Sequence, residues 1–476
     1  MPATPTLAPK SSTVFDTITQ APEYQQKKNE IMRLLRQELS KINGVRGPSN
    51  ELRADYAAEV DRVSKARGRD LYYPFIGSGA GNGPFVELRD GSVKYDLITG
   101  IGVNFWGHGN IDFFEAEFDG LWGDVMQGNL APLPDYGGLM ADLLDVVGPK
   151  SRLKHVWLTS CGAIANENAL KIIRQKKAPA TRIFTFEHCF AGRTTALQEI
   201  TDNAKYREGQ PVYGEVYYLP FFDPRSSDSP DQQADAVVGR IKDEMARYPG
   251  RYAALEFEIV QGEGGFNSAP NEFFVKVCTE AKKAGLAIWV DEIQTFGRTG
   301  EIFAYQRFGL EELVDVVTIA KLLQTGAVLY AAEYNPKPGL VSGTFAGASS
   351  SLRAGRKAIE LLKKQIAGQH GHVRKLEKIA ISEFERLKQG DLGKHVIDYT
   401  VVGGMQAFTL FDGTLEQTKK FLFKLWDLGA IAFFCGHDPY RVRMLPPLAV
   451  MTEAHVKEVF TLIETAVRET AKEIQR

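Results

Sequence analysis

The chain has 476 residues, and its 57 lysines and arginines nearly balance its 59 aspartates and glutamates, giving a formal net charge of −2. This length suits two to four domains with a large core, and 44% hydrophobic with 24% charged residues excludes wholesale disorder. The near-neutral charge argues against a general nucleic-acid-binding protein, and no apolar run approaches the roughly 20 residues of a membrane span. Composition therefore indicates a soluble, enzyme-sized protein and no more.

The N-terminus indicates where in the cell the protein is found, and the histidines and cysteines indicate whether it binds a metal. The first 24 residues contain prolines and acidic side chains but no apolar signal core, which predicts a cytoplasmic protein. The histidines lack ligand spacing, and the cysteines are too far apart for a structural zinc site. No cysteine lies in a context typical of a nucleophile, so we expect reduced thiols and no metal; the four are Cys161, Cys189, Cys278 and Cys435.

The first hundred residues change character once. Residues 1 to about 50 indicate a polar leader around one amphipathic helix, in which Ile31, Leu34, Leu35 and Leu39 recur at helical spacing. From about 70 to 105, glycines with aromatic and β-branched residues predict short strands and turns. The glycine-rich run at 77–83 is similar to a dinucleotide-binding loop, but such a loop needs a helix after it, and residues 84–88 indicate a strand. We therefore expect a flexible loop there.

From about 150 to 335, apolar strands alternate with helices, including a helix over residues 271–284. Several of the strands are nearly continuous apolar runs, as expected in a sheet that is buried on both faces. Alternating β and α units predict a mostly parallel α/β sheet. The strand candidates are residues 155–159, 182–187, 253–260, 286–293, 316–320 and 328–334.

After about residue 345 the pattern changes again. Helical stretches over 352–390 and 452–475 enclose strand-like segments at 397–411 and 430–445, which predicts a smaller α+β domain. We expect the N-terminal region to complete it. The predicted division is an N-terminal segment of the small domain (1–95), a large domain (96–344) and a C-terminal small domain (345–476).

Open α/β sheets bind ligands at the carboxyl ends of their strands, and two such ends carry charged side chains. Asp291 and Glu292 end an apolar strand, although burying a carboxylate without a partner is costly. Thirty positions later, Lys321 directly follows five largely apolar residues. This lysine is either a surface residue or a desolvated amine with a lowered pKa, and only the second suits Schiff-base chemistry.

Two further strand ends complete a pattern. At Gly162 and Ala163 a small-residue turn opens a helix, which offers free backbone N–H groups to a phosphate. After the strand at 182–187, Phe190 and Arg193 present an aromatic ring and a guanidinium together. Each feature alone has an ordinary structural explanation. Together with the acid and the lysine they describe a site for pyridoxal phosphate (PLP).

At these residues the sequence resembles the class III (ω-amino acid type) aminotransferases, which are PLP enzymes of fold type I. The resemblance covers about residues 85 to 470, and its most specific passage is DEIQTFGRTG at 291–300 followed by Lys321. Residues 162–171 and 321–324 are most similar to the lysine 6-aminotransferase branch. The chain departs from the family at Cys161 and Ala163, where Ser and Thr are usual, at Ala191, usually His, and at Ile259, usually Pro.

The resemblance implies a fold of the aspartate aminotransferase type and a role for each cofactor contact. Lys321 is expected to form the Schiff base with PLP and to move the substrate proton, while Asp291 pairs with the pyridine nitrogen. The other implied contacts are Gln294 near the phenolic oxygen, Phe190 on the ring face, Gly162 and Ala163 at the phosphate, and Thr344 at the phosphate of a neighbouring subunit. The last contact implies a homodimer with shared active sites.

The resemblance also implies the substrates. Arg193 would hold the carboxylate of an ω-amino acid, and Arg443 the α-carboxylate of 2-oxoglutarate or glutamate. Glu263 would neutralise Arg443 when no α-carboxylate is present. The implied reaction moves the terminal amine of lysine, ornithine, 4-aminobutyrate or a similar donor to 2-oxoglutarate by a ping-pong mechanism. Alternatives are an amine:pyruvate transaminase, another fold type I enzyme (aminomutase, racemase or decarboxylase), and a paralogue without turnover. The expected partners are small molecules, not nucleic acids or membranes.

Overall fold

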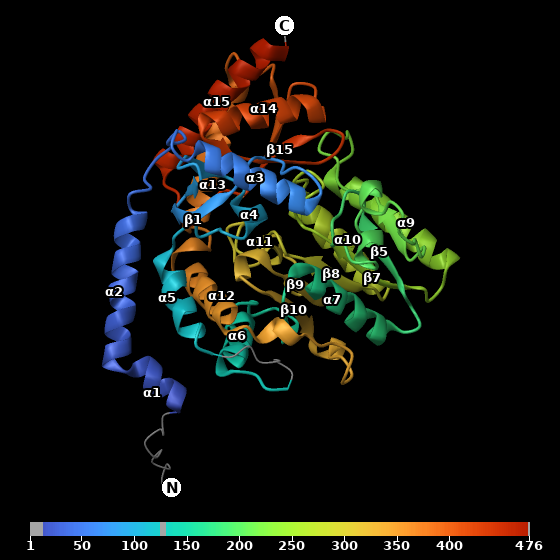
Figure 1. Cartoon of the computed structure of the whole chain (residues 1–476). Helices are drawn as coiled ribbons and strands as arrows, with labels where there is room; N and C mark the ends of the chain where they lie inside the picture. The colour runs from blue at the N-terminus through green and yellow to red at the C-terminus, as the bar shows by residue number, and fades with distance from the viewer. Residues whose placement is uncertain (1–12, 124–129, 475–476) are drawn as a thin grey trace.

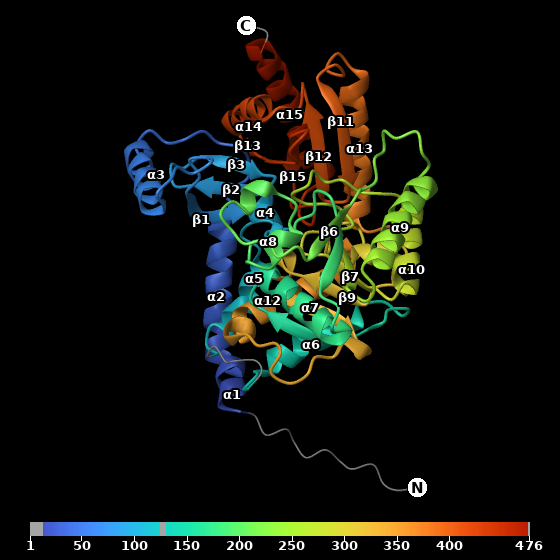
Figure 2. The same cartoon turned by 90° about the vertical axis from the view of Figure 1, so that its right-hand side faces the viewer.

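The computed structural model describes residues 13–123 and 130–474, so the first 12 residues of the expected leader lie outside the described part. A seven-stranded sheet forms its centre, in the order β4-β10-β9-β8-β7-β5-β6 (Figures 1 and 2). The strands are β4 (Leu153–Thr159), β5 (Arg182–Phe186), β6 (Val216–Leu219), β7 (Tyr252–Phe257), β8 (Ala287–Asp291), β9 (Val316–Ile319) and β10 (Gly326–Ala331).

Only β10 runs against its neighbours, because it pairs in antiparallel fashion with both β4 and β9. The other pairings, from β9 through β8, β7 and β5 to β6, are parallel. The predicted α/β fold with a mostly parallel sheet is confirmed. The sequence missed β6, a short edge strand, and placed the last strand too late, since residues 332–334 form a 3-10 turn after β10.

Helices cover both faces of this sheet. Trp289 of β8 packs in the cluster that contains Ile173 of α7 (Gly162–Lys177). Its neighbour Ile288 packs in the opposite cluster, with Val277 of α10 (Asn271–Lys283), beside which lies α9 (Pro230–Arg247). Successive residues of the strand are therefore buried on opposite sides, which explains the continuous apolar runs in the sequence.

Two smaller sheets complete the described part. One joins distant parts of the chain, because β3 pairs in parallel with β13, next to β1 and β2; the strands are β1 (Gly77–Asn82), β2 (Phe85–Leu88), β3 (Val93–Asp96) and β13 (Ala430–Ile431). The other is antiparallel and lies among the C-terminal helices at the top of Figure 1. It contains β11 (Val396–Val402), β12 (Met405–Leu410), β15 (Arg441–Met444) and β14 (Phe433–Cys435). The exact domain boundaries stay a prediction.

The glycine run at 77–83 is largely a strand, so the expected flexible loop is wrong. β1 pairs with β2 in antiparallel fashion, with one irregularity in the register. Small residues are required here because a Cβ on Gly81 would lie 2.4 Å from the Cβ of His108. The close approach of two segments explains the glycine content better than flexibility does.

The helices also differ from the prediction in two places. Instead of continuing from 352 to 390, the chain forms α12 (Ser349–Leu361), a short π-helical turn (Leu362–Ile366) and, after a break, α13 (His372–Gln389). The break contains Gly368 and Gly371, and glycine disfavours a helix. At the N-terminus, α1 (Val14–Gln20) and α3 (Arg53–Arg67) accompany the predicted helix, α2 (Pro22–Leu39), whose Ile31 and Leu34 are exposed in the single chain.

The remaining α-helices are α4 (Thr99–Gly102), α5 (Ile111–Gly120), α6 (Pro134–Asp145), α8 (Leu197–Ile200), α11 (Ala304–Arg307), α14 (Leu415–Leu428) and α15 (Glu453–Ile474). Short 3-10 turns lie at Ala204–Tyr206, Lys321–Leu323, Ala332–Tyr334 and Thr344–Gly347. Within residues 13–123 and 130–474, every helix is too short or too polar to span a bilayer.

Candidate active site

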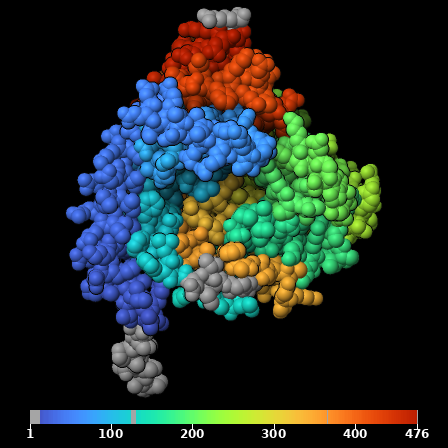
Figure 3. Space-filling model, viewed as in Figure 1, coloured from blue at the N-terminus to red at the C-terminus, as the bar shows by residue number. Residues whose placement is uncertain are grey.

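A cavity of about 490 Å³ lies where five strands of the central sheet end. Figure 3 shows a hollow on one face of the molecule. It lies between the N-terminal segments and the segments after β4 and β5, and residues of about 290–330 form its floor. Seven of the predicted site residues line this cavity: Gly162, Ala163, Phe190, Arg193, Asp291, Gln294 and Lys321. Val103, Ser160, Cys161, Glu258, Gln324 and Thr325 also line it, and the sequence had given none of these a role.

Asp291, the last residue of β8, is 4% exposed and held by two donors. The backbone N–H of Ile293 donates to its Oδ1 at 2.8 Å, and Asn166 Nδ2 donates to its Oδ2 at 2.7 Å. Burial raises the pKa of Asp291 to about 6, although these hydrogen bonds and the charge of Lys321 act in the opposite direction. The carboxylate is therefore available at neutral pH to pair with a cation.

Asn166 is the contact that sequence reasoning missed. Its side chain is fully buried on α7, and its Nδ2 also donates to the carbonyl of Ala191 at 2.6 Å. The sequence signal that could have identified Asn166 is an amide beside the buried residues Ala165, Ala169 and Ile173 of the same helix. A buried amide is stable only with hydrogen-bond partners, and here one partner is the carboxylate of Asp291.

Lys321 begins the short 3-10 turn after β9, with a left-handed φ of +52°. Burial, and next the charge of Arg298, lower the pKa of its amine to about 8. Within the part of the chain that the structure describes, no hydrogen bond or ion pair engages this amine. A substantial fraction of it is therefore neutral and nucleophilic near physiological pH.

The start of α7 forms an anion-binding end of the cavity. The helix begins at Gly162 after Cys161, whose side chain makes no capping hydrogen bond. The first N–H groups of a 16-residue helix therefore lack side-chain partners, and the helix dipole favours a negative charge at this point. A Cβ on Gly162 would lie 2.8 Å from Ile293, so the close approach of the two turns requires glycine.

Glu258 connects two parts of the cavity wall. It is buried after β7, and its carboxylate accepts from the N–H groups of Phe190 and Gly262, both at 2.9 Å. Burial, and next the charge of Asp291, raise the pKa of Glu258 well above its usual range. Gly262 in turn leaves room for Gln294, since a Cβ there would lie 2.2 Å from Gln294 Nε2.

The predicted substrate-binding arginines differ in their surroundings. Arg443 on β15 is 1% exposed, and its Nη1 donates to Glu263 Oε1 at 2.9 Å. Burial has the largest single effect on Glu263 and raises its pKa, but the charge and hydrogen bond of Arg443, together with the charges of Lys321 and Arg193, leave that pKa below its usual value. Arg193 is exposed and stacks on Tyr206, with its guanidinium carbon 4.1 Å from the ring centre. Thus one arginine is neutralised internally and the other is open to a ligand.

Thr344 does not line this cavity. It is exposed on the turn Thr344–Gly347, next to Phe345, which is 67% exposed. Its expected contact with the phosphate of a second subunit therefore stays a prediction.

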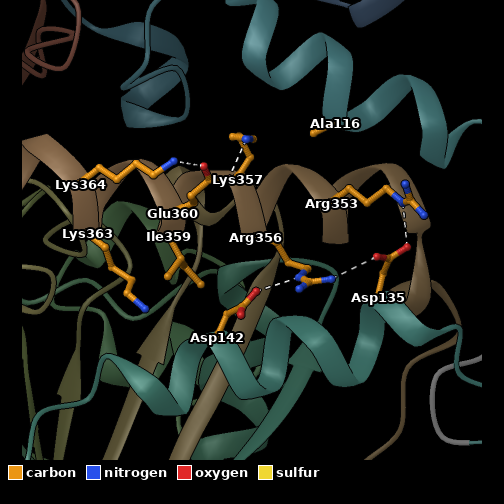
Figure 4. Close-up of a pocket in the computed structure, with 10 residues that line it drawn as sticks. All are labelled: Ala116, Asp135, Asp142, Arg353, Arg356, Lys357, Ile359, Glu360, Lys363 and Lys364. Atoms are coloured by element: carbon orange, nitrogen blue, oxygen red, sulfur yellow. Dashed lines mark hydrogen bonds and ion pairs between the residues drawn. The ribbon is translucent and has the colours of Figure 1, made fainter. Parts of the chain in front are cut away.

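A second cavity, of about 560 Å³, lies among α5, α6 and α12 (Figure 4). Its charged side chains neutralise one another: Arg353 pairs with Asp135 at 2.8 Å, and Arg356 with Asp142 at 2.7 Å. It contains none of the predicted site residues, so we do not place the chemistry there. Among the described residues, no group of three or more His, Cys, Asp or Glu side chains could hold a metal ion.

Comparisons with known proteins show the family to which the chain belongs. The model of the family "Aminotransferase class-III" matches residues 70–467. Acetylornithine aminotransferase of Bacillus subtilis is 29% identical over 402 residues, covering 81% of this chain and 93% of that protein. The 2-aminoadipate transaminase of Pseudomonas putida is 31% identical over 396 residues, covering 80% and 92%.

Solved structures share the fold. Lysine aminotransferase from M. tuberculosis superposes with a TM-score of 0.76 at 19% identity, covering 86% of this chain and 99% of that one. An ω-aminotransferase from Paracoccus denitrificans gives 0.75 at 19% identity, covering 86% and 96%. The family match, which spans most of the chain, confirms the resemblance seen in the sequence. The chain belongs to the class III aminotransferases, and it is a transaminase of the PLP-dependent kind.

Proposed function

We propose that this transaminase moves the terminal amine of an ω-amino acid, such as lysine, ornithine or 4-aminobutyrate, to 2-oxoglutarate. The observation that carries the proposal is the 2.9 Å pair of Arg443 and Glu263 near Lys321, together with an exposed Arg193 on the cavity wall. We further propose that the enzyme acts in the cytoplasm as a homodimer, with Thr344 of each subunit completing the other's site.

The polar groups of the cavity fit PLP. The uncapped start of α7 suits the phosphate, the carboxylate of Asp291 suits a protonated pyridine nitrogen, and the free amine of Lys321 suits the aldehyde. The altered turn at Cys161 and Ala163 removes two hydroxyls but leaves the backbone N–H groups, which supply the helix-terminal contribution.

Bound PLP supplies an electron sink that stabilises negative charge on the substrate carbon beside the transferred nitrogen. Lys321 would hold PLP through its Nζ, and the same amine, with its lowered pKa, would serve as the base that moves the proton from that carbon. Asp291 keeps a proton on the ring nitrogen, and Asn166 keeps Asp291 ionised and oriented. Phe190, whose backbone N–H is anchored by Glu258, would help to hold the ring of PLP by aromatic stacking.

The two arginines allow one site to accept two substrates in turn. Arg193 binds the distal carboxylate of an ω-amino acid, while Glu263 neutralises Arg443 and leaves that side of the pocket uncharged. When 2-oxoglutarate enters, its α-carboxylate takes the place of Glu263 on Arg443. The ping-pong order follows, because both substrates use the same space.

The first experiment tests the chemistry. PLP is added to the protein, the product is reduced with borohydride, and the labelled peptide is mapped. Label is expected on Lys321, absent from K321A and retained in K171A, which changes an exposed lysine of α7. A protein that stays colourless with PLP contradicts the proposal.

The second experiment tests the substrates. Donors with and without a distal carboxylate are paired with 2-oxoglutarate or pyruvate. We expect 2-oxoglutarate to be preferred, and R193L to raise KM about 10–100-fold for ω-amino acids only, as expected for loss of a charged hydrogen-bonded pair. A preference for pyruvate identifies an amine:pyruvate transaminase. If the donor alone does not convert the cofactor to its amine form, an aminomutase, racemase or decarboxylase is favoured.

A further inference from the structure

Arg298 carries a buried positive charge that no carboxylate neutralises within residues 13–123 and 130–474. Its side chain is fully buried, and its guanidinium carbon lies 5.6 Å from the ring centre of Phe105. Nη1 donates to the carbonyl of Gln294 at 2.6 Å, Nη2 donates to the carbonyl of Gly102, and Nε has no partner. Burial lowers the pKa of Arg298 to about 9, so it stays charged at neutral pH. An apolar side chain would fill this space at lower cost, which indicates a use for the charge.

The two carbonyls belong to different walls of the active site. Gln294 follows Asp291, whereas Gly102 ends a turn in which Thr99 and Ile101 have φ of +51° and +59°. Left-handed backbone is strained for a residue other than glycine, so this turn needs external support. Part of it comes from Asp96, whose Oδ1 accepts from the N–H of Thr99 at 2.7 Å. Arg298 supplies a support at the other end of the turn.

The supported turn leads directly into the cavity. Val103, the next residue, lines it, and the Val103 carbonyl accepts from Gln324 Nε2 at 3.1 Å. The backbone of Arg298 is also held in place, because its carbonyl accepts a hydrogen bond from the N–H of Gly404 at 2.8 Å. A Cβ on Gly403 would lie 2.0 Å from that carbonyl oxygen, so the segment has little room to move.

Four charged groups act on the Lys321 amine: Arg298, Asp291, Arg443 and Glu263. Arg443 and Glu263 form a pair at 2.9 Å, so their effects on the amine largely cancel. Asp291 favours the protonated amine, and Arg298 opposes it with the largest effect of the four. Burial has the largest effect on the pKa of Lys321, and among the charged groups Arg298 contributes most to the balance that decides whether the amine is protonated.

We propose that Arg298 is a positioning residue of the transamination site. It joins the turn that carries Gln294 to the left-handed turn before Val103, and it brings a positive charge, which no carboxylate of the described residues neutralises, to the wall of the cavity that Lys321 lines. This inference rests on the proposed role of Lys321.

The test compares R298M and R298K with R307M. Arg307 is a suitable control because it donates to the Thr299 carbonyl at 2.6 Å in the same segment but is neutralised by Glu377 at 2.9 Å. The readout is the pH midpoint of the visible absorbance of the PLP-loaded protein, with the melting temperature of the cofactor-free protein beside it. R298M is expected to raise the midpoint by about one pH unit, because removal of a nearby positive charge raises the pKa of a nitrogen that becomes cationic on protonation, as the Lys321 nitrogen does both free and bound to PLP.

The other variants separate the effect of the charge at position 298 from the effect of the hydrogen bonds that Arg298 makes to the two turns. R298K keeps the charge, so we expect an unchanged midpoint. It lacks the planar guanidinium that donates to both carbonyls, so we expect the two turns to be misplaced and kcat to fall about tenfold. R307M is expected to lower the melting temperature and to leave the midpoint unchanged. An unchanged midpoint in R298M, with only a lower melting temperature, overturns the proposal.

If R298M does not fold, wild-type protein without cofactor decides the question together with R298K. The pH dependence of amine modification at Lys321 should then show a pKa of about 8 in both; an ordinary lysine value in wild type, or a clear rise in R298K, overturns the proposal. Failure of borohydride to attach PLP to Lys321 contradicts the proposed function instead. Attachment with an unchanged midpoint in R298M contradicts only the role of Arg298.

Discussion

Arg443 Nη1 lies 2.9 Å from Glu263 Oε1, which joins a strand of the C-terminal sheet to the loop after β7. Arg443 is 1% exposed, whereas the side chain of Glu263 retains 26% exposure, so Glu263 is the more accessible partner of the pair. A carboxylate that reaches Arg443 competes with Glu263 for the same guanidinium. Substitutions at this contact can therefore measure the competition between a substrate carboxylate and Glu263.

E263Q tests this competition. The amide keeps a hydrogen-bond acceptor but not the charge, so 2-oxoglutarate no longer has to displace a carboxylate, and we expect tighter binding of it. Donors without an α-carboxylate should react about 10-fold or more slowly, because Arg443 is left unneutralised beside them. Half-reaction rates with each substrate measure both effects. Equal changes for both substrate types would contradict the competition.

N166A tests the support of Asp291. Loss of a hydrogen bond to a charged group costs about 1.5–3 kcal/mol, so PLP affinity should fall roughly 10–100-fold. The loss should be larger at low pH, because this hydrogen bond lowers the pKa of Asp291. Fluorescence titration with PLP measures it. N168A, which removes another buried amide of α7, is the control and should affect stability alone.

G262A tests the packing under Gln294. A Cβ here would lie 2.2 Å from Gln294 Nε2, so the amide must move, and a displacement of this size costs about 10–100-fold in kcat. Steady-state kinetics and thermal melting are measured together. G239A, at a position on α9 with no atom within 4 Å, should instead stabilise the protein by about 0.5–1 kcal/mol. Full activity in G262A would show that Gln294 tolerates displacement.

E256Q tests a buried carboxyl group beneath the site. Burial, and next the charge of Asp291, raise the pKa of Glu256 to about 8. Between roughly pH 4.3, where an unfolded glutamate titrates, and pH 8, the folded protein keeps a proton that the unfolded chain has released. The free energy of unfolding contributed by Glu256 therefore falls as pH rises through this window.

Glutamine keeps an acceptor for Thr185 Oγ1, which lies 2.7 Å from Glu256 Oε2, and does not titrate. E256Q should therefore lose less stability than wild type between pH 5 and 8, with a difference on the order of 2–4 kcal/mol at pH 8. Urea denaturation at three pH values measures it, and E272Q on the exposed side of α10 is the control. Identical pH dependence in E256Q and wild type would contradict the buried titration.

The sequence predicted the central strands because burial on both faces leaves a continuous apolar signal. β6 was missed because it is a short edge strand whose first three residues are only partly buried, which weakens that signal. The strand at 77–82 was missed because glycine has low strand propensity, and contact with His108 imposes the structure. Tertiary contacts, rather than local preference, decide such segments.

The residues of the candidate site also divide into those that the sequence could predict and those that it could not. Lys321 and Phe190 follow strands and Asp291 ends one, and parallel strands bring their carboxyl ends together, so topology alone predicts one cavity. Asn166 lies within a helix and Arg298 lies in a turn. Asn166 pairs with Asp291 and Arg298 with Gly102, both far away in the sequence, and no local pattern specifies those two contacts, whereas Gln294, the second partner of Arg298, is a neighbour four residues away.

The pairing of β3 with β13 has a consequence for synthesis on the ribosome. The last residue of β3 emerges roughly 330 residues before its partner Ile431, and at about 5–20 residues per second this interval is roughly 20–70 s. During that time β1 to β3 present an unpaired edge, which is open to other chains. The sheet that β1 to β3 begin therefore depends on the much later β13 for its fourth strand.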